Sequence, residues 1–165
     1  MQQRQMLAPP DTEIGLRAYA IGLMPIDGAF SRFRGAITLG GQGRCSVDLT
    51  VEVASLVGPR ASVRDDIVSP EFLDAPTYPM LQYRGTCGDG LVQGELTLRG
   101  QTHPLRLTLK QEQQRLVATG DIRRAEWGMT ARPFAVGSSV RIRVSVAVAD
   151  PLRRAMLGVM GEQGR

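Results

Sequence analysis

Few side chains in this sequence could carry out catalysis, and they are widely spread. The single histidine, His103, stands in the turn-like stretch Gly100–Pro104. Nucleophilic catalysis needs a base next to its nucleophile, and a lone histidine before a proline is more typical of a turn. The carboxylates Asp65, Asp66 and Glu71 lie near an expected helix start, where acidic groups usually interact with the helix dipole. These residues predict no catalytic site.

Metal and nucleotide sites are not predicted either. No cluster of His, Cys, Asp or Glu has the spacing of zinc ligands. No glycine-rich phosphate loop stands between a strand and a helix. We therefore predict a protein that is not an enzyme and that uses no metal or cofactor.

The two cysteines could meet across a sheet. If the strands on either side of residues 60–79 pair antiparallel, Ser55 lies near Thr77 and Cys45 lies near Cys87. Both cysteines then face inward, and they would form a disulfide only in an oxidising compartment. Because no export signal precedes them, the sequence favours two buried free thiols.

Composition and charge set wider limits. With 165 residues, 42% of them hydrophobic, the chain fits one globular domain with its own core. The net charge of +4 comes from arginines scattered over several expected strands, and only eight residues are aromatic. A single-stranded nucleic-acid site would cluster basic residues among stacking aromatics. We expect no nucleic-acid partner.

The sequence also bears on location. No apolar run approaches the ~20 residues that a membrane-spanning helix needs. The N-terminal residues 1–10 have no apolar core and no cleavage site of a signal peptide. We expect a cytoplasmic protein, or a periplasmic one if this chain is a mature form.

Alternation of apolar and polar residues predicts an all-β fold. Eight strands are expected, at Ile14–Ala20, Ile26–Leu39, Cys45–Ser55, Met80–Thr86, Leu91–Arg99, His103–Lys110, Leu116–Arg123 and Val140–Ala149. Short connections favour an eight-stranded antiparallel up-and-down barrel over residues 11–149. Residues 1–10 are expected to be a tail. Residues 150–165 should form a helical tail that begins at Asp150-Pro151, with a helix over Leu152–Met160 that packs Leu152, Met156 and Val159 on the barrel.

Residues 60–79 interrupt this pattern between the third and fourth strands. Pro70, Pro76 and Pro79 are hard to place in a central strand. Ser69-Pro70 resembles a helix start, with a hydroxyl cap followed by a proline at the first helical position. We predict a short helical insertion that caps one end of the barrel and packs Phe72 against the sheet.

The inward faces of the strands are aliphatic. Every second residue of Cys45–Val53 and of Val140–Val148 is apolar, and the residues between them are mostly polar. Small barrels of this kind are either packed solid or hold one ligand. A packed barrel would serve as an interaction protein, whereas an isomerase or cyclase would need an acid/base pair facing inward, and the inward positions contain none.

Several segments together resemble the YceI-like family. The first is Gly28–Gly35, similar to G-x-F-x-x-F-x-G. Others are Val51–Ser55 with Arg64-Asp65, Ser69–Asp74 with Tyr78-Pro79, Gly94–Thr102, and Gly120–Arg123 with Trp127–Met129. Each motif is weak alone, but they follow the family's order over about residues 11–149.

The resemblance implies a lipocalin-like barrel that binds a long isoprenoid, of the polyprenyl or isoprenoid quinone type, without catalysis. It implies a bacterial carrier, storage or stress-related role, and it leaves a homodimer open. The histidines common in the family's first strand are missing here. The expected cavity-lining residues are Phe33, Ile37, Val51, Val53, Phe72, Leu81, Tyr83, Leu96, Leu98, Trp127, Ile142 and Val144. Of these, Phe72 and Trp127 are expected near an opening, although either could simply be packed in the core.

Overall fold

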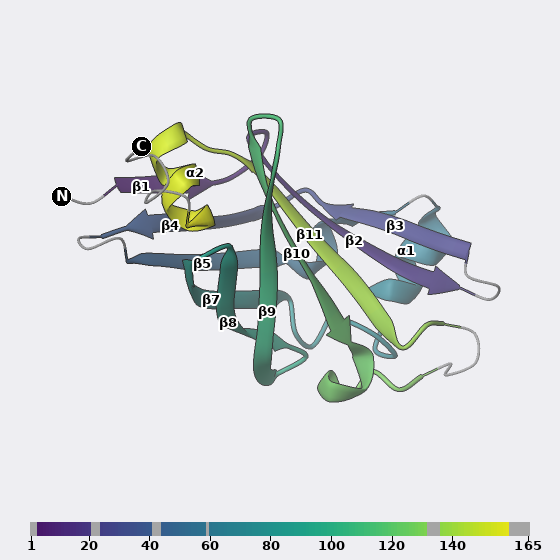
Figure 1. Ribbon diagram of the computed structural model, residues 1–165. Coiled ribbons are helices and arrows are strands. Elements are labelled where there is room, and N and C mark those ends of the chain that lie inside the picture. Colours follow the sequence, from purple (N-terminus) through teal and green to yellow (C-terminus); the bar gives the residue numbers. More distant parts are fainter. Residues whose placement is uncertain (1–2, 21–23, 41–43, 59, 132–135, 159–165) are drawn as a thin grey trace.

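The computed structural model describes residues 3–20, 24–40, 44–58, 60–131 and 136–158. Within these residues, eleven strands form one antiparallel sheet that curls into a barrel-like fold (Figure 1). The strands are β1 (Gln3–Leu7), β2 (Thr12–Ala20), β3 (Met24–Phe30), β4 (Phe33–Leu39), β5 (Cys45–Glu52), β6 (Leu56–Val57), β7 (Met80–Gly88), β8 (Leu91–Leu98), β9 (Gln101–Glu112), β10 (Arg115–Arg123) and β11 (Ser139–Ala147). The all-β, barrel-like prediction is confirmed.

The strand count differs from eight because one predicted strand is divided in two, and because β1 and β6 lie outside the predicted strands. The predicted strand over Ile26–Leu39 breaks between β3 and β4, and the next one breaks at the 3-10 helix η3 (Val53–Ser55). Ser55 holds both breaks together: its hydroxyl accepts from the Arg32 N–H at 3.0 Å and donates to the Glu52 carbonyl at 2.8 Å. These bonds satisfy backbone groups that a straight ladder would otherwise pair.

The bent segment of β3 and β4 is what curls the sheet. In the strand order β1-β4-β5-β7-β8-β9-β10-β11-β2-β3-β6, β4 lies near one end and β3 near the other. β3 pairs with β2, while β4 pairs with β5. One continuous stretch of chain therefore joins the two ends of the sheet around a common interior.

The predicted tail at residues 1–10 contains a strand that the sequence analysis missed. β1 pairs with β4 from Gln3↔Leu39 to Leu7↔Gly35, and Leu7 is buried. Residues 3–7 have few apolar side chains, so their pattern alone gave no strand signal. β1 is therefore held mainly by backbone pairing with the edge of β4 that would otherwise be unpaired.

The predicted pairing of β5 with β7 is confirmed, including its register. Cys45 pairs with Cys87, and Glu52 pairs with Met80. The alternation is confirmed as well: Leu49 and Val51 are buried, while Asp48, next to Leu49, is exposed. A one-residue shift would have exchanged these faces.

The helical insertion is present, but its helix begins earlier than predicted. Helix α1 spans Ala61–Ile67, and Ser69-Pro70 follows its end. The Ser69 hydroxyl donates to the Asp66 carbonyl at 2.6 Å, so it closes the helix instead of starting one. Turns then carry Phe72 and Leu73 into the core. The expected burial of Phe72 is confirmed, whereas the helix start at Ser69-Pro70 was wrong.

Helix α2 (Asp150–Leu157) follows the last strand, as predicted from Asp150-Pro151. Leu152 and Met156 are buried, and α2 lies beside β7 and β9. Val159 and the predicted helix end at Met160 lie outside the described residues. In Figure 1, α1 and α2 lie at opposite ends of the fold.

Another correction concerns His103. The turn between β8 and β9 is at Arg99-Gly100, where both residues have positive φ, and His103 lies within β9. Its ring contacts the edge of Trp127, with 5.1 Å between centroids. The lone histidine is therefore a strand residue that packs on an aromatic ring.

Candidate functional site

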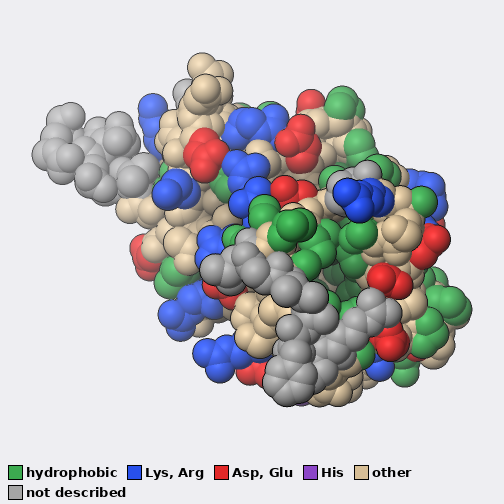
Figure 2. All heavy atoms as spheres, turned by 90° about the vertical axis from the view of Figure 1, so that its right-hand side faces the viewer, with side chains coloured by type: hydrophobic (Ala, Val, Ile, Leu, Met, Phe, Trp, Pro, Cys, Tyr) green, Lys and Arg blue, Asp and Glu red, His purple; other side chains and the backbone are tan. Residues whose placement is uncertain are grey.

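An apolar cavity of about 240 Å³ lies at the α1 end of the interior. Its walls come from several strands around the curled sheet and from the α1 insertion. The aliphatic lining includes Leu16, Ala18, Ala20 and Ile26 of β2 and β3, Val63 and Ile67 of α1, and Val140 and Ile142 of β11. Figure 2, which views this end, shows hydrophobic side chains gathered in a hollow.

The predicted lining residues divide into three groups. Phe72, Leu81, Leu96, Leu98 and Ile142 line the α1-end cavity. Ile37, Tyr83 and Val144 line a second cavity at the α2 end. Phe33, Val51, Val53 and Trp127 line neither, although all four belong to the core or pack against it.

Phe72 and Trp127, both expected near an opening, lie in different surroundings. Phe72 lines the α1-end cavity and is 7% exposed. Trp127 is 1% exposed, and its indole N–H donates to the Leu96 carbonyl at 3.1 Å. A buried indole usually has such a partner. Trp127 is therefore a core anchor of the loop after β10.

The sequence analysis missed the contribution of α1 and β2. Val63 and Ile67 are four residues apart and therefore lie on the same face of the short helix, which faces the cavity. Leu16, Ala18 and Ala20 alternate along β2 in the same way as the residues that were predicted. Both signals are readable in the sequence, but neither was used for the site.

Arg124 is an unexpected buried charged residue in the cavity wall. It is 4% exposed, and burial lowers the pKa of its guanidinium. Among the described residues no carboxylate pairs with it. Instead it donates to the carbonyls of Gly137 (2.7 Å), Met129 (2.8 Å), Ala131 (3.1 Å) and Val136 (3.2 Å).

These bonds give Arg124 a structural role. Because four carbonyls converge on it, the guanidinium fixes the two stretches of chain that carry Met129 and Val136 into the cavity wall. It also lies over the ring of Phe72, 5.5 Å from the centroid. Arg124 thus ties the loop after β10 to the insertion.

Several contacts between described residues fix the 60–79 insertion to the sheet. Arg64 donates to the carbonyls of Leu56 (3.0 Å) and Ala54. Arg99 donates to the carbonyls of Pro70 (3.0 Å) and Phe72 (2.5 Å). A third contact is made by Gly100, where an added Cβ would lie 2.7 Å from the ring of Tyr78. All three lie in or beside the segments that resemble the family motifs.

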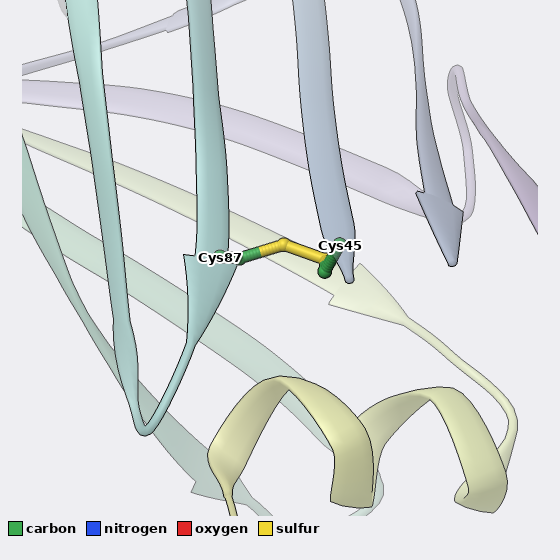
Figure 3. Close-up of a disulfide and its surroundings, with 2 residues drawn as sticks. All are labelled: Cys45 and Cys87. Carbon is green, nitrogen blue, oxygen red and sulfur yellow. A yellow bond between two sulfur atoms is a disulfide. The ribbon is translucent and has the colours of Figure 1, made fainter. Parts of the chain in front are cut away.

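The α2 end differs in size and in covalent structure. Its cavity is about 40 Å³, and α2 contributes Met156 to its lining. Cys45 and Cys87 form a disulfide there between β5 and β7, with Cα atoms 5.0 Å apart (Figure 3). The expectation of two free thiols was wrong, because the predicted register places them within bonding reach.

The described residues show neither a metal-binding cluster nor a membrane-spanning helix. They contain no group of three or more His, Cys, Asp or Glu that could hold a metal ion. They also contain no helix with the length and apolar character needed to cross a bilayer.

Comparison with known proteins identifies the family. The model of the YceI-like domain matches residues 6–148, which is most of the chain. This protein belongs to the YceI-like family. A comparison with curated proteins finds no relative.

Solved structures share the fold at low sequence identity. Burkholderia cenocepacia BcnA is 20% identical, with a TM-score of 0.65 over 84% of this chain and 96% of its own. A polyisoprenoid-binding domain from Saccharophagus degradans, described as implicated in plant cell wall breakdown, is 14% identical, with a TM-score of 0.64 over 90% of this chain and 100% of its own. A Campylobacter jejuni YceI protein is 16% identical, with a TM-score of 0.56 over 74% and 85%.

Proposed function

We propose that this YceI-like protein binds an isoprenoid chain, of the polyprenyl or isoprenoid quinone type, in the cavity at the α1 end. The observation that carries the proposal is the apolar cavity of about 240 Å³ in a sheet that could have packed solid. The likeness to a polyisoprenoid-binding domain supports the ligand class. Removal of apolar surface from water, at ~25 cal/mol per Å², drives binding, and ordering of the flexible chain opposes it.

The proposed role is non-catalytic, as a carrier or store of the lipid, including under stress. Among the described residues that line the cavity, Asp66 and Arg124 are the ionisable ones. Arg124 is engaged with backbone carbonyls, and Asp66 lies exposed on α1. General acid–base chemistry would need a titratable pair aimed at the reacting atoms. The lining supports binding rather than conversion of the lipid.

The proposed location is an oxidising compartment, such as the periplasm. The Cys45–Cys87 disulfide supports this alternative over the cytoplasm, because disulfides persist where thiols are not kept reduced. Alkylation of the denatured, unreduced protein from its native cell would test it. Two labelled cysteines would support the cytoplasm instead.

A matched pair of variants tests lipid binding. Ala18 lines the cavity, whereas Ala29, on the neighbouring strand, is exposed. Ala18→Phe should fill part of the cavity and weaken farnesol binding at least tenfold, about 1.4 kcal/mol, as measured by calorimetry. Ala29→Phe adds the same side chain outside and should bind like the wild type. Equal binding by both variants, or a purified wild type that takes up no isoprenoid, would overturn the proposal.

A further inference from the structure

Two cavities described in the interior have separate linings. The α1-end and α2-end cavities share no lining residue. Along β7 the lining changes from the α1-end cavity at Leu81 to the α2-end cavity at Tyr83. Along β11 it changes between Ile142 and Val144. A layer of side chains therefore separates the two spaces at this level of the barrel.

The ring of Tyr83 forms one side of this layer. Gly94 is the inward position of β8 between Val92, which lines the α2-end cavity, and Leu96, which lines the α1-end cavity. A Cβ at Gly94 would lie 2.7 Å from Cζ and 2.8 Å from the hydroxyl oxygen of Tyr83. The absence of a side chain at Gly94 is what lets the ring lie across β8.

The far end of the ring is fixed on the next strand. The Tyr83 hydroxyl donates to the Leu105 carbonyl of β9 at 2.7 Å, in buried surroundings. Leu105 is also the partner of Gly94 in the β8–β9 register. The side chain thus spans from β7 over β8 to β9, and it is 4% exposed. A ring held at both ends cannot swing aside without losing this hydrogen bond.

The layer continues over the next strands, β9 and β10, where it uses a second glycine. Gly120 is the inward position of β10 between Ala118 of the α2-end cavity and Ile122 of the α1-end cavity. A Cβ there would lie 2.7 Å from Cδ2 of Leu107. Leu107 thus fills the space over β10, as Tyr83 fills the space over β8.

We propose that Tyr83, with Leu107 beside it on β9, sets the length of the apolar chain that the α1-end cavity accepts. This inference rests on the proposed lipid-binding function. A chain that enters at the α1 end fills the cavity as far as the Tyr83 ring. Carbons beyond that length stay in water and gain no burial. Affinity therefore stops rising with chain length once the cavity is full.

The test uses geraniol, farnesol and geranylgeraniol, which have two, three and four isoprene units and the same hydroxyl head. Binding is measured by calorimetry on the intact, disulfide-bonded protein. The wild type should gain little affinity from farnesol to geranylgeraniol. Tyr83→Ala joins the two cavities and should bind geranylgeraniol at least tenfold more tightly than the wild type does. Tyr83→Phe keeps the ring and should keep the wild-type length profile.

A second opening variant covers the case in which Tyr83→Ala does not fold. Leu107→Ala opens the same layer from β9 and should also favour the longest alcohol. Leu109→Ala is the matched control, because Leu109 lines the α2-end cavity two residues further along the strand. It enlarges that cavity without opening the layer and should leave the profile unchanged.

The outcomes separate the two proposals. If the wild type binds none of the alcohols, the proposed function fails and the length inference fails with it. If the wild type binds them but gains affinity steadily through geranylgeraniol, lipid binding stands and the role of Tyr83 is overturned. That role is overturned as well if Tyr83→Ala folds and keeps the wild-type length profile. If Tyr83→Ala does not fold, identical length profiles of Leu107→Ala and Leu109→Ala overturn it.

Discussion

The two ends of this barrel-like fold have opposite properties. At the α1 end, a short helix and turns cover a cavity of about 240 Å³, and arginines fasten the covering segments to backbone carbonyls. At the α2 end, the interior space shrinks to about 40 Å³, and a disulfide and a buried helix face reinforce it. The α1 end contains the larger cavity, whereas the α2 end is more tightly packed and is cross-linked by the disulfide.

This difference shows how one sheet can combine a cavity with a stable core. Well-packed interiors leave few voids, and each void costs contacts. Here the void is concentrated at one end, while residues such as Leu116 and Val146 pack the other. We therefore expect that substitutions at the α2 end mainly lower stability, whereas substitutions at the α1 end also weaken ligand binding.

Removal of the disulfide should have the largest effect and should act on stability alone. Cys45 and Cys87 are 42 residues apart in sequence. The chain-entropy treatment gives a loss of about 4 kcal/mol for a loop of this size, and thus a melting temperature lower by roughly 8–16 °C. Cys45→Ala/Cys87→Ala should show this in calorimetry, with farnesol affinity at low temperature unchanged. A large loss of affinity in the still-folded variant would contradict the separation of the ends.

Loss of Arg124 should come next, and it should affect both stability and the cavity. Arg124→Leu leaves four buried or partly buried carbonyls without their donor, which should lower the free energy of unfolding by about 3 kcal/mol. Met129 and Val136 then lose their anchor, so farnesol binding should weaken as well. Chemical denaturation and calorimetry measure the two effects.

Two controls keep this result specific to the α1 end. Arg124→Lys retains the charge but lacks the planar array of donors, so it should recover only part of the stability. Hydrogen exchange in β5 and β7 near the disulfide should stay slow in both variants. Unchanged stability in Arg124→Leu would show that the loop after β10 has other sufficient anchors.

The strands and their register could be predicted because the alternation is strong and its period is short. The parity of Cys45 and Val51 on one strand, and of Leu81 and Cys87 on its partner, was enough to give both the pairing and the inward faces. Parity predicts which face of the sheet a side chain lies on, but not how far along the barrel axis it lies. For that reason Leu81 and Tyr83 were predicted to line one cavity, although they line two.

Local helix signals and isolated charges were less informative. Ser69-Pro70 fits a helix start on its own, yet α1 ends before it and uses the Ser69 hydroxyl to close its last turn. The scattered arginines were not distinguished from one another, because no sequence pattern marks Arg124 as a guanidinium that will meet four carbonyls. Those carbonyls come from residues up to 13 positions away, so only the fold brings them together.

The smallest predicted effect lies at the border between the two ends and depends on pH. Burial raises the pKa of the Tyr83 phenol, so the folded state holds the proton above the ordinary tyrosine pKa of about 10. Below that pH, Tyr83→Phe should cost about 1 kcal/mol through its lost hydrogen bond. Above it, the unfolded wild type ionises first, and the wild type loses stability by up to about 1.4 kcal/mol per pH unit.

The stability difference between wild type and Tyr83→Phe should therefore narrow as the pH rises above about 10, close by about pH 11 and reverse in sign toward pH 12. Urea denaturation at a series of pH values measures this gap directly. Tyr19→Phe is the matched control, because it removes the same hydroxyl from a side chain that is 37% exposed. A gap that stays constant for Tyr83→Phe would mean that solvent reaches the phenol in the folded state. The layer between the cavities would then be open to water, and the contrast between the two ends would be weaker than the packing of Tyr83 implies.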